Sequence, residues 1–331
     1  MHEKDVEEIL EKLAGLKREI KRTIIGQEEA LDQILTTFIA GGHCLLEGVP
    51  GLAKTLMVQT LASAVDLSFR RIQFTPDLMP TDVIGAEVLE EDRSSGKRFF
   101  KFNKGPLFTN ILLADEINRT PPKTQSALLE AMQEHAVTYA GQRYVLDEPF
   151  FVLATQNPIE QAGTYPLPEA QLDRFLMKVV IDYPAEEAEQ QILAATTGES
   201  SVEVQSVLAQ EEILKAQQLM RQVFISEDLI KYVSSLVRAS RPTENQSDFV
   251  KEWVRWGAGP RAGQAMILTA KTRALLNSRY SVTLEDIAAT AKPVLRHRIL
   301  VNFKGEAEGV SSDAVTDQLL DSTPKPKSPL L

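Results

Sequence analysis

A short glycine-rich loop that ends in a lysine and a threonine is the first stretch of this sequence that could do chemistry. Its residues 48–55 read GVPGLAKT, one residue away from the phosphate-binding pattern GxxxxGK[ST]. In that pattern, backbone N–H groups and the start of the following helix bind phosphate oxygens. The departure is Ala53, which stands where the pattern has its last glycine and where a helix is expected to begin. Glycine-rich turns before helices are common, so the loop alone leaves its role open.

Polar side chains end two apolar runs further along the chain. Asp115 and Glu116 follow ILLA, and Asn157 follows a run that begins FFVLA. An aspartate beside a phosphate loop can hold Mg²⁺ together with the Thr55 hydroxyl. A neighbouring glutamate can polarise a water for attack on a terminal phosphate, and an amide can hold that water. Each residue alone would be an ordinary loop residue, but their combination with the loop favours phosphate chemistry.

Two arginines lie far from the loop in sequence. Arg174 is part of LDRF, and Arg261 is part of GPR at the expected start of a helix. Arginines near a nucleotide stabilise transition-state charge or transmit its presence across an interface. Without further support, each would be interpreted as a surface arginine in a salt bridge.

The elements that must position these residues alternate between strands and helices. Five strands separated mainly by helices predict an α/β fold with an open, mostly parallel sheet that is covered on both faces. The expected strands are 43–47, 69–74, 111–116, 150–157 and 179–181, and the expected helices include 3–22, one ending at 39, and 55–65.

Two hairpins interrupt this alternation. Strands at 87–90 and 97–102 are joined by DRSSG, and residues 137–146 form a second hairpin with Gly141-Gln142 as the expected tight turn. Between the hairpins, Thr120 is the expected N-cap of a helix with Pro121 in its first turn.

Strand patterns end at residue 185, which predicts a second, all-helical domain. Helices are expected at about 186–197, 206–223, 226–239, 261–277 and 284–298, with starts signalled by Ser226 with Asp228 and by Thr283 with Asp286. The last segment has few large apolar residues and is rich in Gly, Ser, Pro and Lys, which predicts disorder. The predicted division is therefore 1–184, 185–303 and a disordered tail at 304–331.

Composition excludes several classes of protein. The 331 residues are 43% hydrophobic and 25% charged, which is typical of a globular protein, and no apolar run reaches the roughly 18–20 residues of a membrane span. A charged start predicts that there is no signal peptide, and the single cysteine, Cys44, excludes internal disulfides. The net charge of −10 disfavours nucleic acid as a partner, and the four histidines show no metal-ligand spacing. We expect a cytoplasmic protein.

The motifs taken together resemble those of one family. GVPGLAKT, LLADEINR, ATQNP, QLDRF and GPRA, in this order and spacing, resemble the MoxR subfamily of AAA+ ATPases over about residues 5–303. The resemblance implies an AAA+ phosphate-loop core, an αβα sandwich with a five-stranded sheet, followed by a helical lid. It also implies that the hairpin at about 85–103 is the helix-2 insert and that the one at about 137–146 is the pre-sensor-1 hairpin. Loops of this subfamily commonly carry the alanine seen at position 53.

The resemblance also assigns roles by motif position. Lys54 would contact the β- and γ-phosphates of ATP, Thr55 and Asp115 would hold Mg²⁺, Glu116 would activate water, and Asn157 would be sensor 1. Arg174 would be the arginine finger that acts on a neighbour's site and Arg261 would be sensor 2, although Arg119 and Arg143 could also face an interface. The implied nucleotide contacts are Ile24, Ile25, Gly26, Gly48, Val49, Pro50, Gly51, Leu52, Ala53, Lys54, Thr55, Leu56 and Asp115.

The implied function is ATP hydrolysis at the subunit interfaces of a ring, most simply a homohexamer, with ATP bound between the sheet domain and the lid. Family members suggest a chaperone that matures or activates partner proteins, often with a von Willebrand A domain, and metal-cofactor insertion is one such pathway. The alternatives are a nucleic-acid motor or transcriptional activator on the same core, a magnesium-chelatase-type motor subunit, and a nucleotide-binding switch that barely hydrolyses. The acidic charge and the lack of a separate DNA-binding domain or zinc motif weigh against the first.

Overall fold

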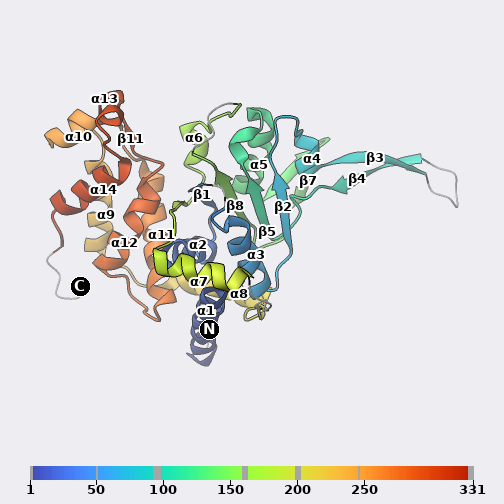
Figure 1. Ribbon diagram of the computed structural model, residues 1–331, viewed down its shortest axis with the longest axis horizontal. Coiled ribbons are helices and arrows are strands. Elements are labelled where there is room, and N and C mark those ends of the chain that lie inside the picture. Colours follow the sequence, from blue (N-terminus) through green and yellow to red (C-terminus); the bar gives the residue numbers. More distant parts are fainter. Residues whose placement is uncertain are drawn as a thin grey trace.

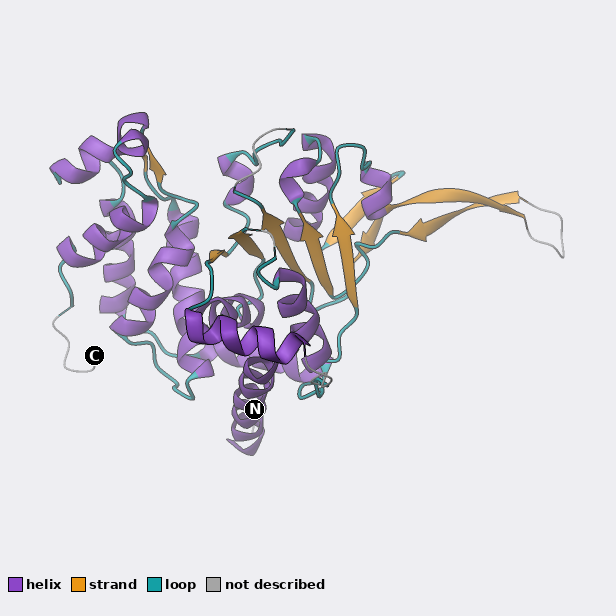
Figure 2. Cartoon of the chain, in the orientation of Figure 1, coloured by secondary structure: helices purple, strands orange, loops and turns teal. Residues whose placement is uncertain are grey.

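The chain folds into an α/β core beside a group of helices (Figure 1). The computed structural model describes residues 3–49, 51–91, 98–158, 163–197, 203–244 and 247–326. Strands gather in the core, and the second group is almost entirely helical (Figure 2).

A five-stranded parallel sheet forms the centre of the core. Its order is β2-β5-β8-β1-β9, and every neighbouring pair is parallel. This confirms the predicted α/β fold, and the carboxyl ends of all five strands therefore meet at one edge. The strands are β1 (Cys44–Gly48), β2 (Phe69–Gln73), β5 (Ile111–Asp115), β8 (Phe151–Gln156) and β9 (Met177–Ile181).

Helices cover both faces of this sheet because alternate side chains of each strand point to opposite sides. Cys44 and Leu46 of β1 pack with buried residues of α1 (Glu3–Thr23), α2 (Glu28–Ile39) and α3 (Lys54–Ala64). Leu45, between them, packs on the other side with buried residues of two further helices. These are α4 (Pro80–Ile84) and α5 (Pro122–Glu134).

The start of α5 differs from the prediction. Its N-cap is Pro121 rather than the predicted Thr120. The buried Thr120 hydroxyl donates instead to the carbonyl of Leu78 over 3.5 Å, so this side chain joins the turn to the segment before α4. Two short elements complete the core, the 3₁₀ helix η1 (Ile117–Arg119) and the helix α6 (Glu169–Leu172).

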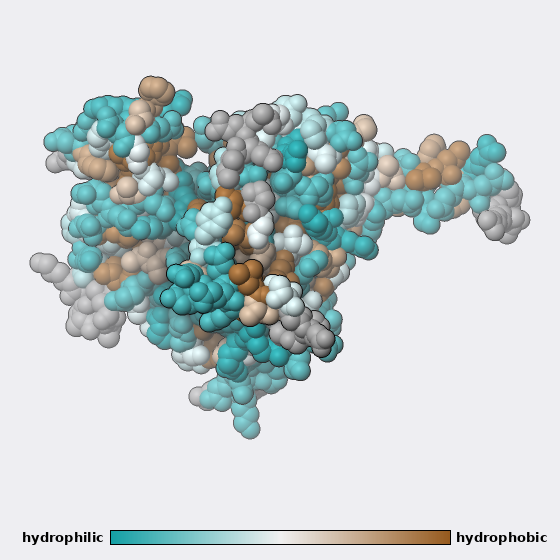
Figure 3. All heavy atoms as spheres, in the orientation of Figure 1, coloured by the Kyte–Doolittle hydropathy of each residue, from teal (hydrophilic) through white to brown (hydrophobic). Residues whose placement is uncertain are grey.

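Two antiparallel hairpins leave the core. One consists of β3 (Gly85–Glu91) and β4 (Arg98–Lys104) and projects far from the sheet (Figure 1). The residues that join its strands, 92–97, lie outside the described residues. Apolar side chains interrupt its hydrophilic surface (Figure 3), among them Leu89 and Phe100, which face each other across the ribbon.

The second hairpin consists of β6 (Ala136–Tyr139) and β7 (Gln142–Val145). Ala140 and Gly141 form its turn with φ values of +48° and +80°, so the turn lies one residue earlier than predicted. Two consecutive residues with positive φ are typical of the tight turns that join antiparallel strands.

The second group contains a helix at each of the five predicted places and a further short one, at 248–253, that was not predicted. The Ser226 hydroxyl accepts a hydrogen bond from the Leu229 N–H, and Thr283 forms a capping box with Asp286, which confirms both predicted helix starts. An antiparallel pair, β10 (Val254–Trp256) with β11 (Leu300–Val301), was not predicted, because two or three residues carry no readable periodicity. The helices are α7 (Glu186–Thr197), α8 (Gln210–Gln222), α9 (Glu227–Ala239), α10 (Asp248–Trp253), α11 (Pro260–Leu276) and α12 (Leu284–Leu295).

The prediction of disorder at 304–331 is wrong for most of that segment. The structure has α13 (Phe303–Ala307) and α14 (Ser312–Ser322), while 327–331 lie outside the described residues. Val315 and Leu319, four residues apart on α14, are fully buried in the same core as α12. One apolar stripe of this kind anchors a helix whose remaining residues are mostly polar, which composition alone does not reveal.

Candidate active site

The loop between β1 and α3 has the backbone of an anion-binding turn. Gly48 must be glycine because a Cβ there would lie 2.9 Å from the carbonyl oxygen of Ile181, and Gly51 has a φ of +89°. Ala53 at the helix N-cap carries no side-chain oxygen, so the first N–H groups of α3 are left for another acceptor. Pro50 lies outside the described residues.

Ala53 itself has a left-handed conformation, with φ +54° and ψ +21°. The sequence places this residue where a helix is expected to begin, a position at which a methyl group is plausible. The observed angles explain instead why the general pattern has glycine, since a residue with a Cβ costs roughly 1–2 kcal/mol in this region. The turn keeps its shape despite that cost.

Lys54 begins α3 and folds back over the loop. Its ammonium donates a hydrogen bond to the carbonyl of Gly48. Partial burial lowers the pKa of Lys54, while the charges of Asp115, Glu116 and Glu47 oppose that shift. The Lys54 ammonium is therefore attracted by three nearby carboxylates, and a bound phosphate group could take their place as its negatively charged partner.

Asp115 ends β5 and is fixed from both neighbouring strands. Its Oδ1 accepts a hydrogen bond from the Thr155 hydroxyl of β8 over 2.6 Å, and its Oδ2 pairs with Arg71 of β2 at 2.6 Å. The fully buried Thr155 Oγ1 also accepts from the backbone N–H of Glu116 over 2.8 Å. One hydroxyl thus orients both acidic residues. Sequence analysis missed Thr155 and Arg71, although a threonine inside the apolar run before Asn157 was a visible signal.

Glu116 stands outside the strand in a left-handed conformation with φ +57°. Its Oε2 accepts from the side-chain amide of Gln73 over 2.7 Å and from Arg119 over 2.9 Å. Gln73 ends β2, next to β5, and was also missed by sequence analysis. Arg119 is one of the alternatives for the arginine that acts on a neighbouring subunit. In this structure it pairs instead with Glu116 of its own chain.

Asn157 follows β8, which lies between β5 and β1 in the sheet. Its side chain is 6% exposed. Because the three strands are parallel neighbours, Asn157 stands between the acidic pair of β5 and the loop of β1. The structure therefore brings the predicted loop, acidic pair and amide to one edge.

The segment before α2 lies near the same edge. Ile24 is buried, and Gly26 has a φ of +76° with a Cβ position only 2.6 Å from Ala188. Gln27 donates to the carbonyl of Asp182 over 2.9 Å, directly after β9, which pairs with β1. This position is compatible with the predicted contact to a nucleotide base.

The two distant arginines lie at the opposite edge of the sheet. Leu176 donates to the carbonyl of His43 over 2.8 Å, so Arg174 precedes the amino end of β9, whereas the loop follows the carboxyl end of β1. β1 has five residues, and the four steps between its first and last residue span about 13 Å at ~3.3 Å per step. Arg261 Nη1 lies 3.6 Å from Asp173 Oδ2, beside Arg174. The arginines therefore lie near each other, away from the phosphate loop of their own chain.

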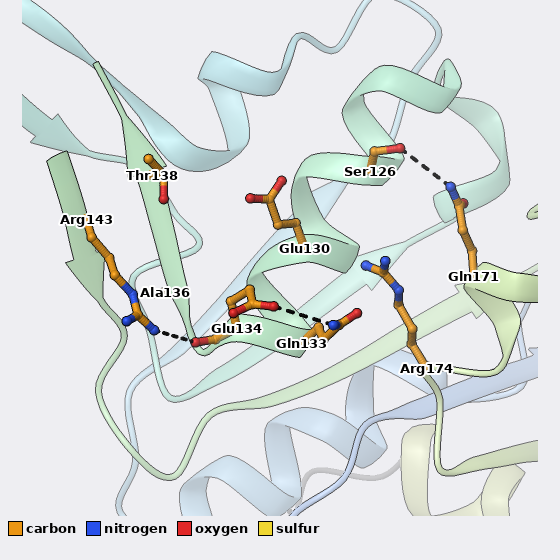
Figure 4. Close-up of a pocket in the computed structure, with 9 residues that line it drawn as sticks. All are labelled: Ser126, Glu130, Gln133, Glu134, Ala136, Thr138, Arg143, Gln171 and Arg174. Atoms are coloured by element: carbon orange, nitrogen blue, oxygen red, sulfur yellow. Dashed lines mark hydrogen bonds between the residues drawn. The ribbon is translucent and has the colours of Figure 1, made fainter. Parts of the chain in front are cut away.

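Arg174 points into a hollow of about 490 Å³ between α5 and the second hairpin (Figure 4). Glu130 and Glu134 of α5 line it, together with Arg143, whose guanidinium donates to the Glu134 carbonyl over 3.3 Å. The hollow offers both arginines and carboxylates to a molecule that approaches from outside.

The residues at the carboxyl edge fit ATP with Mg²⁺. Loop amides and Lys54 suit phosphate oxygens, and the Thr55 hydroxyl and Asp115 carboxylate are hard oxygen ligands. Across the described ranges, no group of three or more His, Cys, Asp or Glu could hold a metal ion. Mg²⁺ fits such a site because it takes one or two protein ligands and completes its shell with water and phosphate.

In the part of the chain that the structure describes, no helix is both long and apolar enough to cross a bilayer.

Comparisons with known proteins agree with this architecture. Residues 43–177 match the ATPase family associated with various cellular activities (AAA), and residues 246–319 match the AAA lid domain. The chain is 42% identical to Chaperone MoxR1 of Mycobacterium tuberculosis, over 93% of this chain and 81% of that protein. It is 39% identical to YeaC of Bacillus subtilis, over 93% and 92% of the two chains.

A solved structure is similar over nearly the whole length. The crystal structure of a candidate ATPase from Cytophaga hutchinsonii superimposes with a TM-score of 0.90 at 42% identity, covering 98% of both chains. With the loop, the acidic pair and the amide at one edge of a parallel sheet, and with these relatives matched over most of their length, this chain belongs to the MoxR family of AAA+ ATPases.

Proposed function

We propose that this protein hydrolyses ATP in a ring of identical subunits and uses the energy to remodel partner proteins. The observation that supports the proposal most strongly is that the residues it requires lie at two opposite edges of the sheet. Asp115, Glu116 and Asn157 meet the phosphate loop at one edge of the sheet, whereas Arg174 and Arg261 lie at the other.

The residues at the carboxyl edge would perform the reaction as follows. Loop amides and Lys54 bind the phosphates, and Asn157 holds the attacking water near the γ-phosphate. Glu116 accepts a proton from that water as it attacks, and ADP leaves with its β-phosphate charge balanced by Lys54. Mg²⁺, held by Thr55 and Asp115, would supply further neutralisation of phosphate charge.

The arginines at the amino edge would complete the site of a neighbouring subunit. Two different edges must meet for this contact, so the interface is heterologous, the kind of interface that forms a ring when the rotation between subunits closes. An arginine supplied in trans is worth roughly 10³–10⁵ in turnover where it has been measured in phosphate hydrolysis. Arg261 would thus act from the lid of the same neighbour that supplies Arg174, rather than on ATP of its own chain.

The biological role follows from the relatives. One similar protein is named a chaperone, which supports a role in acting on client proteins. A cytoplasmic location is a further part of the proposal. A client with a von Willebrand A domain, a hexameric ring and metal-cofactor insertion remain parts of this proposal. A nucleic-acid motor is disfavoured by the net charge of −10, whereas a magnesium-chelatase-type motor subunit and a slow nucleotide switch remain the alternatives.

Substituting Glu116→Gln tests the enzymatic part. The variant should bind ATP with unchanged affinity and lose at least 100-fold in turnover, because the proton acceptor is gone while the phosphate loop is intact. Glu211→Gln, on the exposed side of α8, is the matched control and should behave like the parent chain. Unchanged turnover in Glu116→Gln would refute the proposed role of this residue.

A pull-down with the same variant tests the remodelling part. Glu116→Gln loaded with ATP should retain client proteins that the Lys54→Ala variant, which cannot hold ATP, does not retain. Strong stimulation of the parent ATPase by DNA would favour the nucleic-acid motor instead.

A further inference from the structure

Arg298 makes an unusually complete set of contacts between the helical group and the core. It follows α12, and its side chain is only 5% exposed. Its Nε donates to Asp173 Oδ1 over 2.7 Å, its Nη2 to the Phe175 carbonyl over 2.8 Å, and its Nη1 to the Leu176 carbonyl over 3.1 Å. A longer bond of 3.3 Å joins Nη2 to the Asp173 carbonyl.

These acceptors lie on both sides of Arg174 in the chain. Residues 173, 175 and 176 all offer backbone carbonyls to one guanidinium, and the neighbouring His297 Nε2 lies 3.0 Å from the Phe175 carbonyl and donates to it. The backbone that carries Arg174 is therefore fixed directly by the end of α12. The side chain of Arg174 remains directed into the hollow described above.

Asp173 extends the same arrangement to Arg261. Its Oδ1 accepts from Arg298, and its Oδ2 lies 3.6 Å from Nη1 of Arg261, at the start of α11. Arg298 thus orders the carboxylate that in turn pairs with Arg261. One buried cation thus contacts the backbone on both sides of Arg174 and the carboxylate that pairs with Arg261.

A merely structural joint would not need this residue. Burying a charge is costly, and well-packed apolar side chains stabilise an interface as well or better. The planar guanidinium is distinguished by its five donors in a fixed geometry, which a lysine cannot reproduce. The chain uses that geometry at the segment that carries Arg174.

We infer that Arg298 is a positioning residue that holds Arg174 and Arg261 in place for the ATP site of the neighbouring subunit. This inference rests on the proposed function, in which both arginines act in trans. It adds a residue that contacts no nucleotide and belongs to none of the motifs identified in the sequence.

Arg298→Lys tests the inference, because lysine keeps the charge but cannot donate to three carbonyls and a carboxylate together. Turnover should fall roughly 10- to 100-fold with unchanged ATP affinity, as expected when a catalytic group moves by about 1 Å.

Arg296→Lys is the matched control. Arg296 also joins the end of α12 to the core, through the Lys178 carbonyl of β9 at 2.8 Å, and it pairs with Asp313 of α14 within the helical group. Within the described ranges, its side-chain hydrogen bonds do not include residues 173–176. The Arg296→Lys variant should lose less than about threefold in turnover, while its loss of thermal stability should be similar to that of the Arg298→Lys variant. Equal losses of turnover in the two variants would overturn the inference.

Mixed assemblies provide a readout that a structural role would not change. Arg298→Lys keeps its phosphate loop, and Lys54→Ala keeps its arginines, so assemblies co-purified from both through two different tags should regain turnover. No gain with Arg298→Lys, when Arg174→Ala does regain turnover with Lys54→Ala, would overturn the inference and leave the proposed function intact. No gain for either pair would overturn both.

If Arg298→Lys fails to fold, Asp173→Asn replaces it. That change preserves shape and removes the charge that joins Arg298 to Arg261. It should give the same loss of turnover and the same recovery with Lys54→Ala, and a normal turnover would contradict the inference.

Discussion

The side-chain amide of Gln73 donates a hydrogen bond to Oε2 of Glu116 over 2.7 Å, from the end of β2 to the residue after β5. The proposed proton acceptor is thus oriented by a strand that carries none of the sequence motifs. Gln73→Leu removes this bond, together with the 2.9 Å bond that Gln73 Oε1 accepts from Arg71, and leaves that of Arg119. We therefore expect turnover to fall about three- to tenfold with little change in the KM for ATP. Arg70→Gln, on the same strand, is the control, and unchanged turnover in Gln73→Leu would contradict the orienting role.

Thr155 provides a second test, in which stability and turnover should change together. Thr155→Val keeps the shape and removes the hydroxyl that bridges Asp115 Oδ1 and the Glu116 N–H. Leaving buried polar groups without this partner should lower the free energy of unfolding by about 1–3 kcal/mol. We also expect roughly tenfold slower turnover, because both acidic residues lose their common support. Thr155→Ser should retain both properties, and a Val variant that matches the parent would exclude the bridge as a functional element.

His43 predicts a dependence of stability on pH. Burial lowers the pKa of His43 to about 4, while in the unfolded chain the value is near 6.5. Because the folded-state pKa is the lower one, the unfolded state binds the extra proton as pH falls, and stability is lost between about pH 6.5 and pH 4. The loss from pH 7 to pH 5 should be about 2 kcal/mol from this residue.

Urea denaturation at pH 7 and pH 5 measures this effect. His43→Gln should remove about 2 kcal/mol of the difference between the two pH values, whatever its effect on stability at pH 7. Burial also lowers the pKa of His297, so part of the pH dependence should remain in the variant. An identical pH difference in parent and variant would contradict the neutral, buried state of His43.

The helix α14 can be tested as a structural element of the lid. Leu319 is fully buried, so Leu319→Ala should lower the free energy of unfolding by about 2–5 kcal/mol. Asp321→Ala, on the exposed side of the same helix, should change it by less than about 0.5 kcal/mol. Equal stabilities of the two variants in thermal melts would mean that this helix does not pack as described.

The sequence was sufficient to predict those site residues that end or directly follow a strand. Asp115, Glu116 and Asn157 each follow an apolar run, and parallel strands bring their carboxyl ends together whatever their order. Gln73 and Thr155 depend on that order, because each reaches Asp115 or Glu116 from the strand that lies next to β5. The sequence of one strand does not say which strand lies beside it.

The arginines and the last helices required tertiary information of another kind. Arg174 and Arg261 are 87 residues apart, and they lie near each other where Asp173 pairs with both Arg298, which follows α12, and Arg261, at the start of α11. Composition suggested disorder after residue 303 because α14 exposes most of its polar residues and buries only a narrow stripe. In both cases packing between distant elements decided the outcome.

The most direct measurement concerns the separation of the phosphate loop from the arginines. Lys54→Ala and Arg174→Ala should each be inactive alone, the first because it cannot bind ATP and the second because it cannot complete a neighbour's site. Assemblies that contain both variants, co-purified through two tags, should regain a substantial fraction of the parent turnover, since some interfaces then combine an intact loop with an intact arginine. Turnover no higher than that of the separate variants would contradict a site shared between subunits.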